Sequence, residues 1–211
     1  IKAIAIAIKF GLIGLLFSVF INATAFITAL LLVAMVLVYT YGTKQHFILG
    51  PVTMGLCRGL SLLLGTAASG QFPNLPFLAA LGITGYVAAL TFLARQETTT
   101  RTLSKPARLL PMGFGLLTLA LMIPTLIHQP FTPVATLVLF LSWAGAIRSG
   151  WNGSVMVHNP EQRPAAIGQL VRALVFYQAA LCVTYGDGTV GLAILCCWPL
   201  ATWLGRWFYS S

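Results

Sequence analysis

Long apolar runs alternate with short polar clusters along this chain. Residues 10–43, 59–94 and 109–147 contain no Lys, Arg, Asp or Glu. Each run is long enough for two helical crossings of a hydrocarbon layer, at roughly 20 residues per crossing. The pattern therefore predicts an all-α, polytopic transmembrane helix bundle with no β-strand.

Turn signals divide these runs into about eight spans. Asn22-Ala-Thr is a tight reversal, and Gly50-Pro51 places a proline where a helix begins. Small residues repeat in several spans and permit neighbouring helices to approach closely: Gly11 and Gly14, Gly55 and Gly59, and Gly113 and Gly115. The predicted helices cover residues 4–21, 24–42, 51–69, 76–94, 107–127, 132–149, 166–184 and 189–208.

The chain is expected to form one domain. No soluble domain or linker interrupts the apolar pattern, so residues 1–211 are predicted to be a single transmembrane helical domain. Because the first residue is Ile1 rather than Met, we expect this domain to be the C-terminal portion of a longer chain.

The positive charges are distributed asymmetrically. All twelve Lys and Arg fall in loops or helix ends on one side of the predicted bundle, whereas the other side holds Asp187. Cytoplasmic loops of membrane proteins carry an excess of Lys and Arg. The protein is therefore predicted to lie in a bacterial inner membrane or an organellar membrane. Its loops 43–50, 95–106 and 149–165 are predicted to face the cytoplasm, or the stroma or matrix of an organelle.

The composition limits the kinds of molecule that this protein is expected to bind. Apolar residues make up 58% of the chain and charged residues 7%, and the mean hydropathy is +0.91. The net charge of +9 does not indicate nucleic acid, because the basic residues are not grouped with aromatics on a soluble surface. Anionic lipid headgroups are the simpler partner. The four cysteines lack CxxC spacing, so we expect buried free thiols rather than a metal site or disulfides.

Three basic residues lie deeper inside predicted spans than the others. Lys9, Arg58 and Arg172 each fall one to two turns from the basic end of a helix. A cation within the membrane is costly and normally faces a wet cavity or a partner. We expect these three side chains to point into one cavity open to the inner face. The alternatives are that each extends separately to the headgroups, or that Arg58 is satisfied by neighbouring carbonyls.

Four segments carry a family resemblance. They are Tyr39–His46 (YTYGTKQH), Gly50–Gly65 (GPVTMGLCRGLSLLLG), Gly85–Glu97 (GYVAALTFLARQE) and Pro160–Arg172 (PEQRPAAIGQLVR). In these segments the chain resembles the UbiA superfamily of intramembrane prenyltransferases, and most closely its EboC-like branch. The second segment is the most specific, and together the four follow the family's order over nearly the whole chain.

The resemblance implies a function and a site. Members of this family transfer a prenyl group from an isoprenoid diphosphate to a lipophilic acceptor, using Mg²⁺ held by two aspartate-rich motifs on cytoplasmic loops. The depth of the family's diphosphate site corresponds here to Lys9, Arg58 and Arg172, with Lys44 near the same inner face.

The chain departs from the family in its acidic residues. The first aspartate motif would precede Ile1, and the second should fall at 90–101, where Glu97 stands between Arg95 and Arg101. One carboxylate beside two cations is a poor Mg²⁺ site. We therefore expect no metal to bind through this loop, and we assign no catalytic residue.

Two functions remain open from the sequence. The chain is either part of a prenyltransferase whose first metal motif lies upstream, or a non-catalytic, degenerate member of the same fold. The second role would be structural or ligand-binding, within a larger complex with other membrane subunits. A transporter is less well supported, because the spans lack paired intramembrane charges and interrupted repeats.

Overall fold

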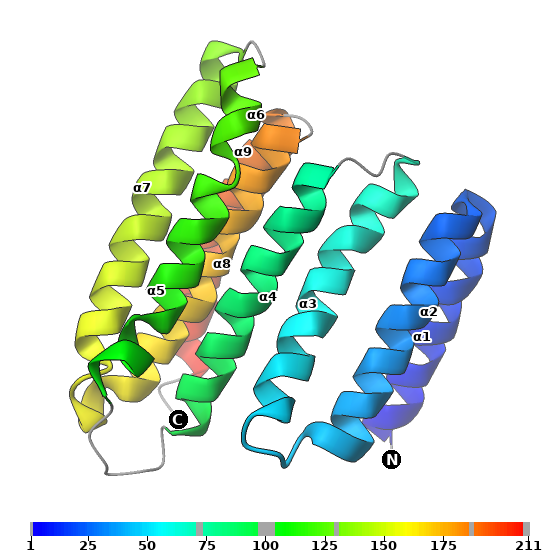
Figure 1. Cartoon of the computed structure of the whole chain (residues 1–211), viewed down its shortest axis with the longest axis horizontal. Helices are drawn as coiled ribbons and strands as arrows, with labels where there is room; N and C mark the ends of the chain where they lie inside the picture. Colours follow the sequence, from blue (N-terminus) through cyan, green and yellow to red (C-terminus); the bar gives the residue numbers. More distant parts are fainter. Residues whose placement is uncertain (1, 71–73, 97–103, 129–130, 186–187, 209–211) are drawn as a thin grey trace. The chain divides into compact units, whose positions relative to one another are not determined.

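The computed structural model of the chain describes residues 2–70, 74–96, 104–128, 131–185 and 188–208. Within these ranges the protein is helical and contains no strand, as predicted (Figure 1). The elements are α1 (Lys2–Ile21), α2 (Ala23–Leu37), the π-helix η1 (Val38–Thr43), α3 (Leu49–Ala68), α4 (Asn74–Arg95), α5 (Lys105–Ala120), α6 (Ile123–His128), α7 (Pro133–Met156), the 3₁₀ turn η2 (Pro160–Gln162), α8 (Arg163–Tyr185) and α9 (Gly188–Phe208).

Six helical segments in the described ranges are long and apolar enough to cross a membrane. They are Ala23–Thr43, Leu49–Ala68, Pro76–Arg95, Lys105–Ile127, Pro133–Met156 and Pro160–Tyr185. Two shorter apolar segments, Ile8–Ile21 and Gly188–Trp203, lie in the first and last helices. These lengths and compositions indicate a polytopic integral membrane protein. The seventh and eighth crossings stay predictions.

Large apolar side chains on the surface agree with this class. Phe20 is 86% exposed, Phe10 70% and Phe140 69%. A water-soluble protein rarely exposes contiguous apolar surface of this kind, whereas a bilayer solvates it. The outward faces of these helices are therefore suited to lipid contact.

The chain divides into two compact units, Ile1–Ala88 and Ala89–Ser211. In the first unit α2 packs against α1 and α3. Asn22, the non-helical residue between α1 and α2, accepts a hydrogen bond from the Ala25 amide at 2.6 Å and donates to the Ala67 carbonyl at 2.9 Å. The predicted reversal is thus an N-cap that also ties α2 to the end of α3.

Glycines bring α3 close to α4 inside the first unit. A Cβ at Gly55 would collide with the Thr84 carbonyl, and a Cβ at Gly59 would collide with the Thr84 hydroxyl. The two glycines are four residues apart, so they lie on the same face of α3. The predicted close approach at Gly55 and Gly59 is confirmed, and it leaves no room for a larger side chain. Gly115 also has a close neighbour, Tyr177, whereas Gly11, Gly14 and Gly113 have open space beside them.

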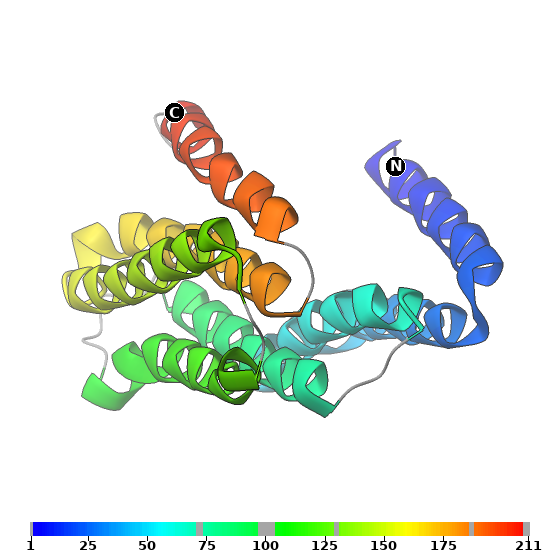
Figure 2. The same cartoon turned by 90° about the horizontal axis from the view of Figure 1, so that it is seen from above.

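The second unit is built on α7, α8 and α9, with α5 packed against α7 (Figure 2). Small residues again set the spacing. Phe176 of α8 occupies the space beside Gly145 of α7, and Leu170 fills the space beside Gly153. Bulky side chains of α8 therefore pack into gaps left by glycines of α7.

Two helix boundaries differ from the predicted ones. The helix predicted over 132–149 continues to Met156, and the next begins at Arg163 rather than at residue 166. The predicted loop 149–165 is therefore largely helical, because Ser149, Gly150 and Gly153 are small enough to be buried against neighbouring helices.

The helix predicted over 107–127 is interrupted. α5 ends at Ala120 and α6 begins at Ile123. Pro124 lacks an amide hydrogen for the bond to residue 120, and its ring disfavours a continuous helix at this point. The span remains one apolar segment, Lys105–Ile127, with a break near its C-terminal end.

The cysteines are free, but they are less buried than predicted. Cys57 and Cys182 are half-buried, whereas Cys196 and Cys197 are exposed on α9. The last two lie among exposed apolar residues of a helix suited to lipid contact. Cysteine serves there as a small apolar side chain.

Candidate anion-binding cavity around Arg172

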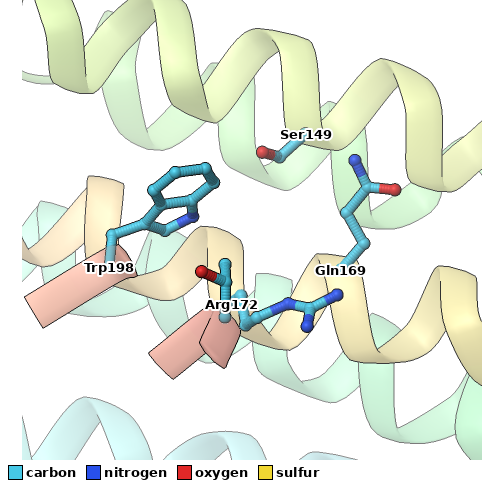
Figure 3. A pocket seen from close by; sticks show the side chains of 5 residues that line it. Ser149, Gln169, Arg172 and Trp198 are labelled. Atoms are coloured by element: carbon cyan, nitrogen blue, oxygen red, sulfur yellow. The ribbon is translucent and has the colours of Figure 1, made fainter. Parts of the chain in front are cut away.

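A cavity of about 190 Å³ opens between α7, α8 and α9 of the second unit. Figure 3 shows Ser149 on one side, Gln169 and Arg172 along α8, and the indole of Trp198 opposite. Thr202 of α9 completes the lining. All five side chains carry a polar group, which is unusual inside a span of this hydropathy.

The geometry of α8 sets the depth of Arg172. This residue lies nine positions after the first residue of the helix, Arg163, which corresponds to about 14 Å along the axis. Gln169 is one turn earlier on the same face. Arg172 is half-buried, and its backbone lies well inside the span rather than at its end.

No group in the described part of the chain neutralises Arg172. Within residues 104–128, 131–185 and 188–208 of this unit, its guanidinium forms no hydrogen bond or ion pair. A charged side chain in this setting requires water, carbonyls or a counter-ion. The cavity can admit any of the three.

One of the lining residues, Trp198, is aromatic and packs against a second ring. The rings of Phe176 and Trp198 lie 5.5 Å apart between centroids, at an interplanar angle of 41°. Ser149 is only 8% exposed, which holds its hydroxyl in the cavity lining. The cavity therefore combines a polar lining with an apolar boundary.

The lining favours an anion over a cation. Arginine, glutamine, serine, threonine and tryptophan all offer N–H or O–H donors, and none of the five lining residues is a carboxylate or a histidine. Mg²⁺ needs several hard oxygen ligands, so these residues do not fit a Mg²⁺ site. They fit a phosphate, a diphosphate or a carboxylate.

The structure places the predicted basic residues in different units. Arg58 lies nine positions after the start of α3 and is exposed, and Lys9 on α1 is also exposed. Lys44 follows the π-helix, and its backbone amide donates to the Tyr39 carbonyl at 2.9 Å. These three belong to the first unit and Arg172 to the second. Arg58 and Arg172 stand at equal distances from the first residues of their helices. Their depth in a membrane and a cavity shared with Lys9 stay predictions.

The predicted second metal motif lies mostly outside the described residues. Glu97 and Arg101 fall in the segment 97–103, and Asp187 falls in 186–187. Elsewhere, the described residues hold no group of three His, Cys, Asp or Glu side chains that could bind a metal. The expectation about Mg²⁺ at Glu97 therefore stays a prediction.

Arg163 is a buried residue that the sequence did not single out. It was expected in an inner loop, but it begins α8 and is 0% exposed. Its Nη1 donates to the Gln96 carbonyl at 3.1 Å and its Nε to the Val157 carbonyl at 3.4 Å. Arg163 thus fastens the end of α4 and the end of α7 to the start of α8.

The sequence analysis also did not identify the other polar residues that line the cavity with Arg172. The spacing of Gln169 and Arg172 on one helical face was the available signal, but Ser149, Trp198 and Thr202 come from other helices.

Comparisons with protein-family profiles, curated proteins and solved structures each found no match for this chain.

Proposed function

We propose that this membrane protein binds an isoprenoid diphosphate, with the diphosphate held at Arg172. The observation that carries the proposal is the half-buried Arg172 guanidinium, which has no described counter-charge in a cavity lined by donors. A diphosphate offers the negative charge that this lining lacks, and its oxygens can accept hydrogen bonds from the lining donors. The resemblance to UbiA-like prenyltransferases supplies the ligand class.

The apolar surroundings suit the hydrocarbon part of such a ligand. Trp198 lines the cavity and packs against Phe176. The neighbouring part of α9 exposes apolar side chains such as Leu200 and Trp203. A diphosphate near Arg172 could extend its isoprenoid chain along this surface without exposing it to water. Ser149, Gln169 and Thr202 would then orient the phosphate oxygens by hydrogen bonds.

Prenyl transfer is the finer version of this proposal. Ionisation of the allylic carbon requires the departing diphosphate to be neutralised, which Mg²⁺ supplies in the resembling family. The cavity around Arg172 contains no carboxylate, so a metal site would have to be built elsewhere. A non-catalytic subunit that binds the same ligand within a larger membrane complex is the alternative.

Binding can be tested with the purified full chain in lipid nanodiscs. Farnesyl diphosphate, farnesol and inorganic pyrophosphate are titrated by calorimetry against the wild type, Arg172→Gln and Arg148→Gln. Arg148 is an exposed arginine of α7 outside the cavity, which makes it a matched control. We expect Arg172→Gln to weaken farnesyl diphosphate binding by about tenfold or more, and Arg148→Gln to leave it unchanged.

The results would test ligand binding and would distinguish an enzyme from a non-catalytic subunit. Equal affinity for farnesol and farnesyl diphosphate, or no effect of Arg172→Gln, would overturn the binding proposal. Formation of a prenylated lipid from labelled farnesyl diphosphate, Mg²⁺ and membrane lipids would support the enzyme. Binding without such a product would favour the non-catalytic subunit.

A further inference from the structure

A second cavity, of about 270 Å³, lies between the start of α5 and the end of α7. α5 contributes Lys105, Arg108 and Leu109, which share one face of that helix. The α7 side is a stripe with helical spacing, formed by Trp151, Ser154, Val155 and the following His158. None of these residues lines the cavity around Arg172.

Two buried polar atoms at this cavity lack a partner. Ser154 is only 5% exposed, and its Oγ forms no hydrogen bond within the described part of the chain. The Nε of Arg108 is likewise buried and forms none there. A buried donor without a partner is destabilising. Both atoms are enclosed by protein, but both belong to residues that line the cavity. A rotation of either side chain would bring its donor to a ligand there.

The local charge is positive. Lys105 and Arg108 lie in the first turn of α5, a helix of 16 residues whose N-cap, Ser104, makes no side-chain capping bond. The N-terminal end of a helix carries a partial positive charge and unpaired amides. No carboxylate is among the lining residues. The positive charge and the lack of carboxylates favour an oxyanion as the ligand of this cavity.

The rim of the cavity is apolar and faces outward. Trp151 and Val155 are each 58% exposed, and Leu109 is 50% exposed. Trp is favoured at the boundary between hydrocarbon and headgroups. A soluble phosphate would gain nothing from this rim, whereas the acyl chains of a lipid would cover it.

We propose that the cavity between α5 and α7 binds the phosphate of an anionic phospholipid. Arg108 and Ser154 donate to the phosphate oxygens, Lys105 and His158 border the headgroup, and the acyl chains lie along the exposed apolar rim. This site is separate from the cavity around Arg172, so either proposal can fail without the other.

Native mass spectrometry of the full chain released from detergent tests the proposal. The Arg172→Gln background is used throughout, so that lipid held at the first cavity does not contribute. Phosphatidylglycerol and phosphatidylcholine with identical acyl chains are titrated in parallel, and inorganic phosphate is added in a third arm. We expect one tightly retained phosphatidylglycerol and weaker retention of phosphatidylcholine.

Variants locate the bound lipid. In that background, Arg108→Gln should weaken phosphatidylglycerol retention by about tenfold and Ser154→Ala by about threefold, whereas Arg148→Gln should have no effect. Ser154→Ala removes only a hydroxyl, so it keeps the test valid if Arg108→Gln impairs folding. Equal retention of the two lipids, no effect of Ser154→Ala and Arg108→Gln, or binding of inorganic phosphate in place of lipid would each overturn the proposal.

Discussion

Three arginines of the second unit show how one side chain takes different roles in different surroundings. Arg163 is fully buried and donates to backbone carbonyls, Arg172 borders a polar cavity inside α8, and Arg148 is exposed on α7. The same charge is therefore structural at Arg163, is proposed to bind a ligand at Arg172, and has no described contact at Arg148. Position along the span does not separate these roles, because the neighbouring helices decide which groups the guanidinium meets.

At the residue scale, replacing Arg163 should destabilise the second unit. Arg163→Ala leaves the carbonyls of Gln96 and Val157 without their donor. We expect a loss of about 2–3 kcal/mol of stability, read as a lower temperature for loss of the monodisperse peak in detergent. Arg148→Ala is the control and should cost less than about 0.5 kcal/mol. Equal melting of the two variants would contradict the structural role of Arg163.

At the scale of elements, packing depends on where small residues lie along facing helices. Gly55 and Gly59 admit α4 against α3, and Gly145 and Gly153 admit side chains of α8 against α7. Other glycines, including Gly65 of α3, have open space beside them. Interfaces between membrane helices are enriched in small residues because contact there depends on close van der Waals packing. The cavity around Arg172 and the cavity between α5 and α7 lie between helices whose spacing depends on such packing.

The glycine contacts of α3 give a direct test. Gly59→Leu places a side chain where Thr84 already lies, and overpacking of this kind costs about 1–3 kcal/mol. Gly65→Leu adds the same atoms to the same helix in open space, so it should be tolerated. The measurement is the fraction of each variant that remains monodisperse after heating in detergent. If Gly65→Leu were as damaging as Gly59→Leu, the close contact would not be the cause.

At the scale of the whole molecule, the six described spans and the charge pattern predict a membrane topology. Arg95 ends α4 and Lys105 begins α5, and Arg163 begins α8 after the end of α7. Within the second unit these helix ends meet at one level, as the cavity between α5 and α7 and the Arg163 contacts require. A single basic side is therefore the expected arrangement across the membrane.

Cysteine labelling can test this topology. In a background with the four native cysteines replaced, Gln45→Cys and Asn159→Cys should react with a membrane-impermeant maleimide from the basic-loop side. Ser69→Cys and Thr132→Cys should react from the opposite side. If α1 and α9 both cross, tags at the two ends of the chain will share the basic-loop side. Labelling of Gln45→Cys and Asn159→Cys from opposite sides would refute the single basic side.

The sequence alone determined the features that depend on local composition. Charge-free runs predicted the helices and the membrane class, Asn22 predicted the reversal, and the pair Gly55 and Gly59 predicted a close approach. Each follows from a short-range cause: the free energy of transferring a segment into lipid, the capping of one helix end, or the absence of a side chain.

Only the tertiary structure decided which polar groups meet. It extended α7 to Met156, buried Arg163, and assembled the cavity around Arg172 from α7, α8 and α9. Ser149, Trp198 and Thr202 are more than 20 residues from Arg172 in the chain. The local sequence therefore could not predict that they line the same cavity. The physical reason is that packing fixes the rotation of each helix about its axis, and hydropathy alone leaves that rotation open.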